Sequence, residues 1–538
     1  MKQKAISTNW TTFFIVIIFL LGIFFRFINL EGKVYWIDEV HTSLRASGFS
    51  REEFVDLAPR RKIISIEELH QFQKPNSERN FNAAIKAISS SEHSPLYYVL
   101  ARVGIDLFGS SINVTRGVAA FLSLFLFPCI YWLSQELFNN RFTSLVITAL
   151  IAVSPLQILY AQEAREYSLL AVAIALSSAI FLRFINQKSS FGYPNKFNWW
   201  WYGLSVALGL YTHPLFVLVM ISHGIYSVIV NGFRWGRLLK QYVFATALGI
   251  LLFIPWILVF IFNEDGVGMW IERDIPLGFW LQRWLLNISA TFFDLQTIYA
   301  ERFFDVESVR DFKLHFNSIS ALLIGFIFIL VVYSTYFLIT RNSQKSSFFI
   351  FLLIGVTALG LGIPDLIFGG QRSTVARYII AVYLGIQIIV GYCIAANITN
   401  AKSRNWQRQF WRIIFVLTIT LSIVSSWQML QSKTWWNKYS SYYNAEVAAI
   451  INQTEKPLII SNAKRISRST SLSYQLRENA RFLLLDEEDT YIPEYTQFSK
   501  VFLFRPFPDF LQQLQQNNLY TIEPVFTKGH LYQLTYNR

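Results

Sequence analysis

Long apolar runs limit what this chain of 538 residues can fold into. A helix that crosses a bilayer needs about 20 consecutive, mostly apolar residues, and it satisfies all of its backbone hydrogen bonds internally. Eleven runs approach that length, so we expect a polytopic α-helical membrane protein with about eleven spans. The runs lie at residues 11–30, 113–138, 142–160, 167–185, 199–212, 213–231, 241–262, 317–340, 347–363, 378–399 and 412–430.

The composition supports this class. Charged residues make up 15% of the chain, whereas soluble proteins carry about 25%. The net charge of +13 could indicate nucleic-acid binding, but much of the excess lies in short loops between apolar runs, where it orients a membrane protein. Both cysteines, Cys129 and Cys393, lie inside apolar runs, which rules out a disulfide framework and a paired-cysteine metal site.

Basic residues recur in alternate loops. With the N-terminus in the cytoplasm, every short inner loop is basic and nearly free of acids, as the positive-inside rule requires. The first run is not followed by a small-residue cleavage site, which favours an uncleaved span over a signal peptide. An odd number of spans places the tail from Gln431 outside. We therefore expect an integral protein of the plasma (inner) membrane, with a cytoplasmic N-terminus and an extracytoplasmic C-terminal domain.

The first outer loop, residues 31–112, begins with two neighbouring carboxylates, Asp38 and Glu39. An acidic pair at this depth is costly unless it is solvated, paired or functional, and a solvated pair that only ends a helix is the alternative. Helical pieces are predicted at 64–72 and 81–89. An apolar piece that ends at Gly109 is interpreted as a juxtamembrane helix, because a full span there would invert every later loop.

Further polar groups fall on the same outer side. They are Glu92, His93 and Tyr97 in the first loop, Glu163, Arg165 and Tyr167 in the second, His213 before a helix-breaking proline, and Arg372, Arg377 and Tyr378 in a late glycine-containing loop. Taken singly, each has an ordinary interpretation, such as an interfacial anchor, an aromatic belt, a helix cap or a kink histidine. Two arginines beside glycines at a helix start suit an anion such as phosphate. Their joint occurrence on one side favours a functional site.

The composition changes at Gln431. Strands are predicted at 456–460, 481–485, 500–504 and 530–535, with helices at 471–479 and 509–516 between them. We expect residues 1–430 to form the transmembrane domain and 431–538 to form a small α/β domain. Because this segment has no glycine-rich phosphate loop and no nucleophile elbow, we expect it to be accessory.

The motifs together resemble a known family. Trp36-Ile37-Asp38-Glu39 after the first span, His93-Ser94-Pro95-Leu96-Tyr97-Tyr98, Glu163-Ala164-Arg165-Glu166-Tyr167 and Arg377-Tyr378 are similar in order, side and spacing to the C-type (GT-C) membrane glycosyltransferases. The closer resemblance is to family 39, the protein O-mannosyltransferases and aminoarabinose transferases. It covers roughly residues 10–400. Ser94 stands where the family usually has proline, Ala381 also replaces a proline, and Glu163 replaces aspartate.

The resemblance implies a reaction and its residues. The donor would be a monosaccharide on a polyprenyl phosphate, and transfer to a lipid, glycan or protein acceptor would occur on the extracytoplasmic face. Asp38 would be the catalytic base, Glu39 its neighbour, and Glu163 the competing candidate for the base. The residues expected to bind substrate are Glu92, His93, Tyr97, Arg165, Tyr167, His213, Arg372, Arg377 and Tyr378.

The residue types fit this chemistry. A carboxylate can accept the proton of an attacking hydroxyl, and arginines can stabilise a departing phosphate in place of a metal. With no nucleophile evident, single displacement with inversion is the simplest course. A divalent metal held by Asp38, Glu39, Glu163 and His213 is the alternative, but no tight ligand spacing supports it. We expect no required cofactor.

Two rival functions are considered. A transporter or flippase of lipid-linked sugars also needs charged groups for phosphate, but it predicts internal repeats and charges at the midplane of the bilayer. The sequence shows no clear repeat, and its polar groups gather at the outer surface. A catalytically inactive scaffold is the third interpretation, and the presence of Asp38 argues against it.

Overall fold

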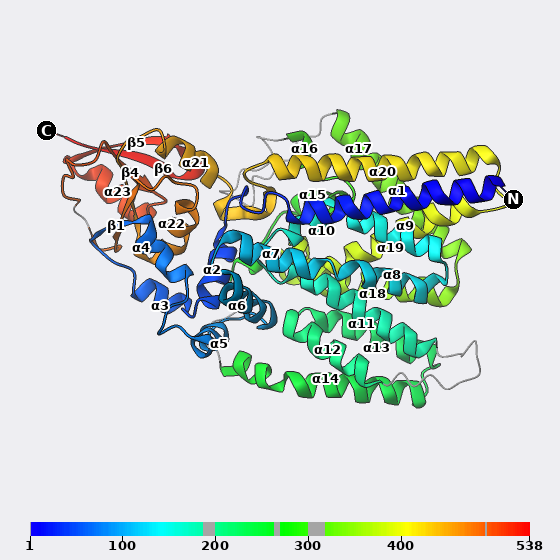
Figure 1. Cartoon of the computed structure of the whole chain (residues 1–538). Helices are drawn as coiled ribbons and strands as arrows, with labels where there is room; N and C mark the ends of the chain where they lie inside the picture. Colours follow the sequence, from blue (N-terminus) through cyan, green and yellow to red (C-terminus); the bar gives the residue numbers. More distant parts are fainter. Residues whose placement is uncertain (1, 187–198, 263–268, 300–317, 490–491, 538) are drawn as a thin grey trace.

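The chain forms a long helical bundle with a small sheet domain at one end, and the N-terminus lies at the opposite end of the bundle (Figure 1). This computed structural model describes residues 2–186, 199–262, 269–299, 318–489 and 492–537. The predicted class, a helical membrane protein with a small α/β domain, is confirmed.

The bundle helices follow the predicted apolar runs. Among the described residues, seven helices are long and apolar enough to cross a membrane, or eight if α9 and α10, which bend by 59° at their junction, count as one broken span. Here α7 and α8 count as one span (Ile112–Phe138). The count of eleven is not confirmed, because the apolar part of α1 (Phe13–Phe27), α12 and α13 are shorter than a full span. The helices are α1 (Lys2–Phe27), α7 (Ile112–Ser123), α8 (Leu126–Phe138), α9 (Arg141–Ala152), α10 (Pro155–Ala161), α11 (Tyr167–Ile185), α12 (Trp200–Thr212), α13 (Phe216–Val230), α14 (Arg237–Phe262), α17 (Ser318–Arg341), α18 (Gln344–Phe368), α19 (Ile380–Thr399) and α20 (Asn405–Gln431).

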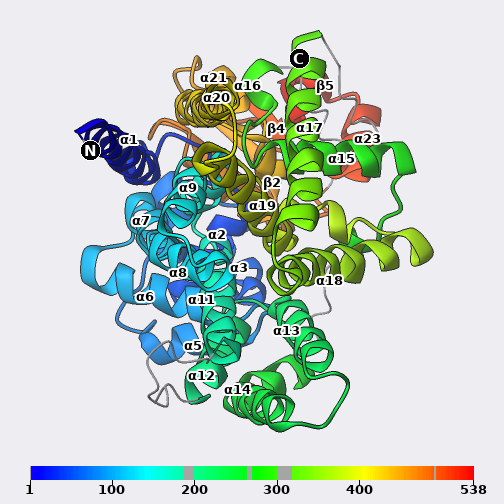
Figure 2. The ribbon, with the colours of Figure 1, turned by 90° about the vertical axis from the view of Figure 1, so that its right-hand side faces the viewer.

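Burial separates central helices from lipid-facing ones. In an 18-residue apolar stretch of α11 and of α19, 83% is buried inside the protein. In the corresponding stretches of α14 and α17, only 22% is buried. Figure 2, turned by 90° from Figure 1, shows α11 and α19 inside the bundle and α14 and α17 towards its edge. A helix that is apolar on all sides is stable either in a protein core or against lipid, and both kinds occur here.

The first loop forms a layer of short helices between the bundle and the sheet (Figure 1). Ser50, Ser65 and Asn80 accept hydrogen bonds from backbone N–H groups at the starts of three of these helices, which fixes where the helices begin. The predicted helix at 81–89 is confirmed, whereas only Ile66–His70 of the predicted helix at 64–72 is α-helical, because Ile63–Ser65 pairs as a strand with Arg481–Leu483. The juxtamembrane piece has only 13 residues. The helices are α2 (Ile37–Ala46), α3 (Arg51–Asp56), α4 (Ile66–His70), α5 (Phe81–Ser89) and α6 (Leu96–Phe108).

The sheet has six strands in the order β1-β3-β2-β4-β6-β5. The four predicted strands are present, while β1 and β5 were not predicted. The three central strands are parallel and the others pair antiparallel. The strands are β1 (Ile63–Ser65), β2 (Pro457–Asn462), β3 (Arg481–Leu485), β4 (Lys500–Phe504), β5 (Tyr520–Phe526) and β6 (Leu531–Tyr536).

The sheet is not built from C-terminal residues alone, since β1 belongs to the first loop. One face of the sheet buries Phe482 and Phe502 against first-loop side chains such as Phe54 and Leu69. The other face buries Leu483 and Leu503 with Leu514 of α23 (Pro508–Gln516). The first loop is therefore part of both the sheet and its core. The helices α21 (Asn444–Ile451) and α22 (Ile466–Ser473) complete this unit.

A connecting segment, residues 433–441, joins α20 to the sheet domain. It contains a 3₁₀ stretch, Trp436–Ser441, in which Tyr439 has φ 37° and ψ −114°. A tyrosine with positive φ is strained, and such residues gather at functional sites. Short pieces of the late outer loops lie nearby: Met269–Glu272, α15 (Leu277–Ser289), α16 (Gln296–Tyr299), Arg372–Thr374 and Ala376–Tyr378.

Candidate active site

A cavity of about 460 Å³ lies where the bundle helices meet the first-loop layer. Of the twelve site residues predicted from the sequence, nine line it. Its walls come from five outer loops, so residues far apart in the sequence share one space. The lining residues are Asp38, Glu92, His93, Arg165, Tyr167, His213, Pro214, Leu215, Ile271, Glu272, Leu361, Arg372, Arg377 and Tyr378.

Asp38 lies in the first turn of α2, which begins after Trp36. A carboxylate is favoured at a helix N-terminus, because the unpaired N–H groups there carry partial positive charge. Its side chain is 22% exposed, and its Oδ2 lies 3.4 Å from an Arg377 nitrogen. Asp38 is thus partly open to the cavity and can accept a proton from a group bound there.

Arg377 is held by aromatic rings. The rings of Trp36, Tyr167, Tyr378 and Tyr439 lie 5.4–5.7 Å from its guanidinium carbon. Rings at this distance attract a cation electrostatically and also fix its plane. The guanidinium is positioned beside Asp38, where it can bind an anion.

Arg165 supplies a second cation to the cavity. It donates to the Tyr98 hydroxyl (2.8 Å) and to Glu166 (3.2 Å), and it is 1% exposed. His213, whose Nδ1 accepts from the Leu215 N–H (3.1 Å), lies on the same wall. Burial, and then the charges of Arg165 and Arg377, lower the pKa of His213 to about 3, so this imidazole is neutral at pH 7.

His93 and Glu92 also line the cavity. The His93 ring stacks on Tyr98 at 5.9 Å, and its Nε2 lies 3.4 Å from a Glu92 oxygen. Burial, followed by Arg165 and Arg45, lowers the pKa of His93 well below its ordinary value. Its backbone carbonyl accepts from Trp256 (3.0 Å), which ties this loop to α14.

The loop that carries Arg372 and Arg377 is shaped by Asp365. Asp365 accepts from the N–H of Arg372 (3.0 Å) and from the N–H and hydroxyl of Ser373 (2.6 and 2.7 Å). Gly370 has φ 120°, and a side chain there would also meet the carbonyl of Ile271. Arg372 itself faces two acids, Asp365 at 3.4 Å and Glu272 at 3.6 Å.

Glu39 lies outside the cavity lining. It is fully buried, and it accepts two hydrogen bonds of 2.7 Å from Arg116, one of 2.9 Å from the N–H of Ala164 and one of 3.2 Å from Lys438. Burial raises the pKa of this carboxyl, but the charges of Arg116 and Lys438 outweigh burial and lower it to about 2. Glu39 therefore joins the first loop, α7, the second outer loop and the connecting segment.

Glu163 is likewise buried behind the cavity. One oxygen accepts from Asn437 and lies 3.7 Å from Lys438, while the other has no hydrogen-bond partner among the described residues. Burial, together with the neighbouring charge of Glu39, raises the pKa of Glu163 to about 7 against the opposing effect of Lys438. Near neutral pH this carboxyl is partly protonated.

Tyr97 is the third predicted residue that does not line the cavity. Its hydroxyl donates to the Thr115 carbonyl (2.9 Å), and the side chain is fully buried. Sequence reasoning also missed residues that hold the site together, namely Trp36, Arg116, Lys438 and Tyr439. Arg116 and Lys438 lie far from Glu39 in sequence and belong to no local motif, so no sequence pattern could have paired them.

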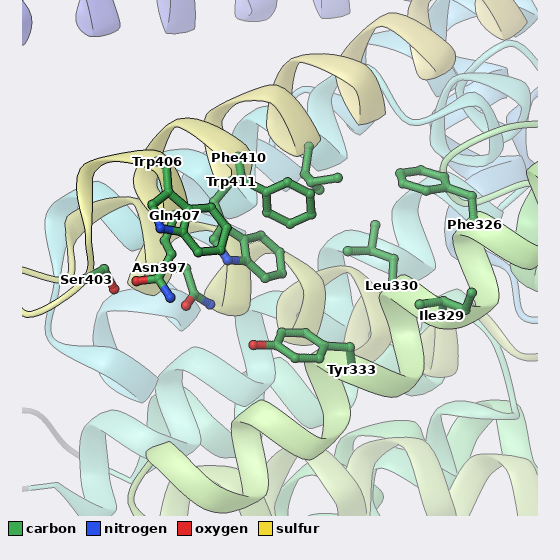
Figure 3. A pocket seen from close by; sticks show the side chains of 11 residues that line it. Phe326, Ile329, Leu330, Tyr333, Asn397, Ser403, Trp406, Gln407, Phe410 and Trp411 are labelled. Atoms are coloured by element: carbon green, nitrogen blue, oxygen red, sulfur yellow. The ribbon is translucent and has the colours of Figure 1, made fainter.

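The described residues contain no group of three or more His, Cys, Asp or Glu that could hold a metal ion. A second cavity, an apolar groove of about 560 Å³, runs between α17, α19 and α20. Figure 3 shows its wall of aromatic and aliphatic side chains, including Tyr333, Trp406 and Trp411, with Asn397 and Gln407 at one end. None of the predicted site residues lines this groove, and lipid chains can fill it.

Residues 92–259 match the model of a protein family described as dolichyl-phosphate-mannose-protein mannosyltransferase. No curated protein matches the chain in sequence. The fold is similar to that of ArnT from Cupriavidus metallidurans, both bound to undecaprenyl phosphate (12% identity, TM-score 0.51) and in the apo state (13%, TM-score 0.52), with 98% of each chain covered in both comparisons. It is also similar to AglB, the archaeal oligosaccharyltransferase from Archaeoglobus fulgidus, in complex with an inhibitory peptide and a dolichol-phosphate (12% identity, TM-score 0.50), over 99% of this chain and 75% of that one. At these identities the likeness is one of fold.

Proposed function

We propose that this chain, which has the fold of C-type membrane glycosyltransferases and matches a family 39-like model over residues 92–259, is a membrane glycosyltransferase. It would transfer a hexose or a pentose from a polyprenyl phosphate to an acceptor hydroxyl or amine. The observation that carries the proposal is one cavity that holds a partly exposed carboxylate, Asp38, together with three arginines, Arg165, Arg372 and Arg377. A base for the acceptor and cations for a leaving phosphate are the two requirements of this reaction.

The reaction proceeds in one displacement. The acceptor oxygen attacks the anomeric carbon while Asp38 takes the acceptor's proton. The bond between the anomeric carbon and the phosphate oxygen breaks, and the electron pair leaves with the lipid phosphate. Attack from the face opposite the phosphate inverts the anomeric configuration. Arg377, oriented by its aromatic rings, stabilises the charge that develops on the phosphate.

The position of the cavity suits a donor that is anchored in the bilayer. The cavity lies at the end of the spanning helices, so a lipid embedded in the bilayer would hold its phosphate near this depth. Two of the similar structures are described as containing undecaprenyl phosphate or a dolichol-phosphate, which supports a donor of this chemistry. Nothing in these comparisons favours the transporter.

We further propose that the cavity faces the extracytoplasmic side of the plasma (inner) membrane. The basic loops support a cytoplasmic N-terminus, and the sheet domain lies at the other end of the bundle (Figure 1). We propose that residues 1–430 carry the reaction. Residues 431–538 form an accessory domain that contributes no reacting group, although their connecting segment supports the cavity.

A turnover assay tests the proposal. The purified full-length protein is incubated with a panel of polyprenyl-phosphate hexoses and pentoses plus acceptors, and release of the lipid phosphate is measured. Asp38→Asn keeps the size of the side chain but removes the proton acceptor, so we expect turnover to fall by about 10²–10⁴-fold with donor affinity retained.

Glu163→Gln serves as the comparison, because Glu163 is the competing base. We expect a much smaller loss, since this carboxyl lies behind the cavity. If Asp38→Asn turns over like the parent while Glu163→Gln is inactive, Glu163 is the base instead. If the parent releases no lipid phosphate with any donor, the proposed function is wrong.

A further inference from the structure

One buried arginine beside the cavity has no counter-charge. Arg45 is 5% exposed, and the described residues offer its guanidinium neither a hydrogen bond nor a carboxylate partner. Other buried arginines of this region are paired: Arg116 with Glu39 at 2.7 Å and Arg165 with Glu166 at 3.2 Å. A buried, unpaired charge is unfavourable unless a ligand neutralises it.

Arg45 shares a helix face with the proposed base. Both lie on α2, and Asp38, His41 and Arg45 follow each other at spacings of three and four residues, which places them on one side of the helix. Seven residues of helix correspond to about 10 Å. Asp38 lines the cavity and Arg45 does not, so a molecule bound at Asp38 would have to extend past His41 to reach Arg45.

Tyr98 links Arg45 to the cavity lining. The guanidinium of Arg45 lies 5.9 Å from the Tyr98 ring. On the same ring, His93 stacks at 5.9 Å, and Arg165 donates to the hydroxyl at 2.8 Å. Both of these residues line the cavity. Arg45 therefore borders the wall that His93 forms.

No described carboxylate lies within 4 Å of the Arg45 guanidinium. Asp38 faces Arg377, one oxygen of Glu166 accepts from Arg165, and Glu92 lies beside His93. His41, the neighbour of Arg45 on the helix, contacts the Ser467 hydroxyl at 3.0 Å, and burial and then Arg45 lower its pKa well below the ordinary value. With no described carboxylate paired to Arg45, an anionic ligand would supply the missing counter-charge.

We infer that Arg45 binds an acidic group, a phosphate or a carboxylate, on the acceptor. The acceptor would then be an acidic molecule whose reacting hydroxyl lies roughly 10 Å from its anionic group, as the spacing along α2 requires. This inference rests on the proposed function. The donor's phosphate is assigned to Arg377 beside Asp38, two helical turns away from Arg45.

Matched acceptors test this inference. Three alkyl disaccharides serve as acceptors. They differ only in the sugar that does not receive the transferred group, which carries a phosphate, a carboxylate or neither. With the full-length parent protein, we expect kcat/KM for the two acidic acceptors to exceed that for the neutral one by roughly 10-fold or more, since hydrogen bonds to charged groups are the stronger ones. The ratio of kcat/KM for the phosphate acceptor to kcat/KM for the carboxylate acceptor identifies the preferred acidic group.

Arg45→Gln should raise KM for the acidic acceptors by roughly 10- to 100-fold and leave KM for the neutral acceptor and for the donor unchanged. Arg45→Lys keeps the charge but loses the planar fork, so the preference for acidic acceptors should drop several-fold and not vanish. Lys86→Gln, which removes an exposed charge from α5 of the same loop, is the control and should behave like the parent.

An equal loss with acidic and neutral acceptors, or a raised KM for the donor alone, would overturn the inference. So would a parent that prefers the neutral acceptor, or an unchanged preference in both Arg45 variants. If the parent turns over no acceptor at all, the proposed function has failed, and that result is distinct from each of these.

Discussion

The guanidinium of Arg377 shows how a charge is fixed at this site. Four rings surround it at 5.4–5.7 Å, and Asp38 lies 3.4 Å from one nitrogen. The rings fit a flat, delocalised cation better than a compact ammonium. Keeping the charge alone should therefore not preserve the function.

Arg377→Lys tests this point. We expect the Kd for the polyprenyl-phosphate donor to rise by about 10-fold or more, because the two-pronged geometry and the ring contacts are lost. Donor binding is measured by isothermal calorimetry on the full-length protein. Arg341→Lys, at the exposed end of α17, is the control, and an unchanged Kd in Arg377→Lys would remove Arg377 from the phosphate site.

The raised pKa of Glu163 predicts how the stability of the protein depends on pH. Its pKa is about 7 in the folded protein and 4.5 in an unfolded chain, so the folded state binds more protons between these values. The stabilisation is present below pH 4.5 and is lost as pH rises through about 7. Buried neutral histidines such as His93 and His213 act in the opposite direction, so the prediction concerns a difference. The thermal midpoint of the parent minus that of Glu163→Gln should fall between pH 5 and pH 8.

Differential scanning fluorimetry in detergent measures both profiles. Glu67→Gln is the matched control, because the Glu67 side chain is 88% exposed, and its profile should follow the parent. Parallel profiles for the parent and Glu163→Gln would contradict the raised pKa of this carboxyl.

At the scale of elements, α2 gives neighbouring carboxylates opposite environments. Successive residues point about 100° apart around a helix, so Asp38 reaches the cavity while Glu39 points into the protein. There Glu39 meets Arg116 of α7 and Lys438 of the connecting segment. The same ionic cluster therefore orients α2 and anchors the segment that follows α20.

The connecting segment should be required for stability. Lys438 is 2% exposed and bridges Glu39 at 3.2 Å and Glu163 at 3.7 Å. Removing one partner of a buried ion pair typically costs about 3–5 kcal/mol. We expect Lys438→Met to lower the thermal midpoint clearly, whereas Lys433→Met, on the exposed start of the same segment, should not. Equal midpoints would show that the bridge contributes no stability.

At the scale of the whole molecule, the N-terminus and the sheet domain lie at opposite ends of the bundle (Figure 1). Combined with the basic inner loops, this arrangement predicts that the two termini are on opposite sides of the membrane. A fluorescent protein that matures only in the cytoplasm should fluoresce when fused before Met1 and stay dark when fused after Arg538. A bright C-terminal fusion would invert the proposed topology.

Much of the fold could be predicted, because its signals are local. Apolar runs predict helices wherever a bilayer must be crossed, and the first-loop helix predicted at 81–89 has the same bounds as α5. The helices α12 and α13, around His213, could not be counted reliably, since length alone does not tell a short span from a broken one. The strand β1 was missed because three residues of the first loop form a strand only against β3.

By itself, the sequence determined the membrane class, the side on which the polar groups gather and most of the residues that line the cavity, because hydropathy and charge act over short stretches of chain. Only the tertiary structure decided which of the predicted residues face the cavity and which are buried behind it. Glu39 and Glu163 are buried in a cluster with Lys438, Asp38 is left open, and Arg45 is left without a partner. These differences depend on which distant side chains approach and exclude water, and the free energy of a charge is set by those neighbours.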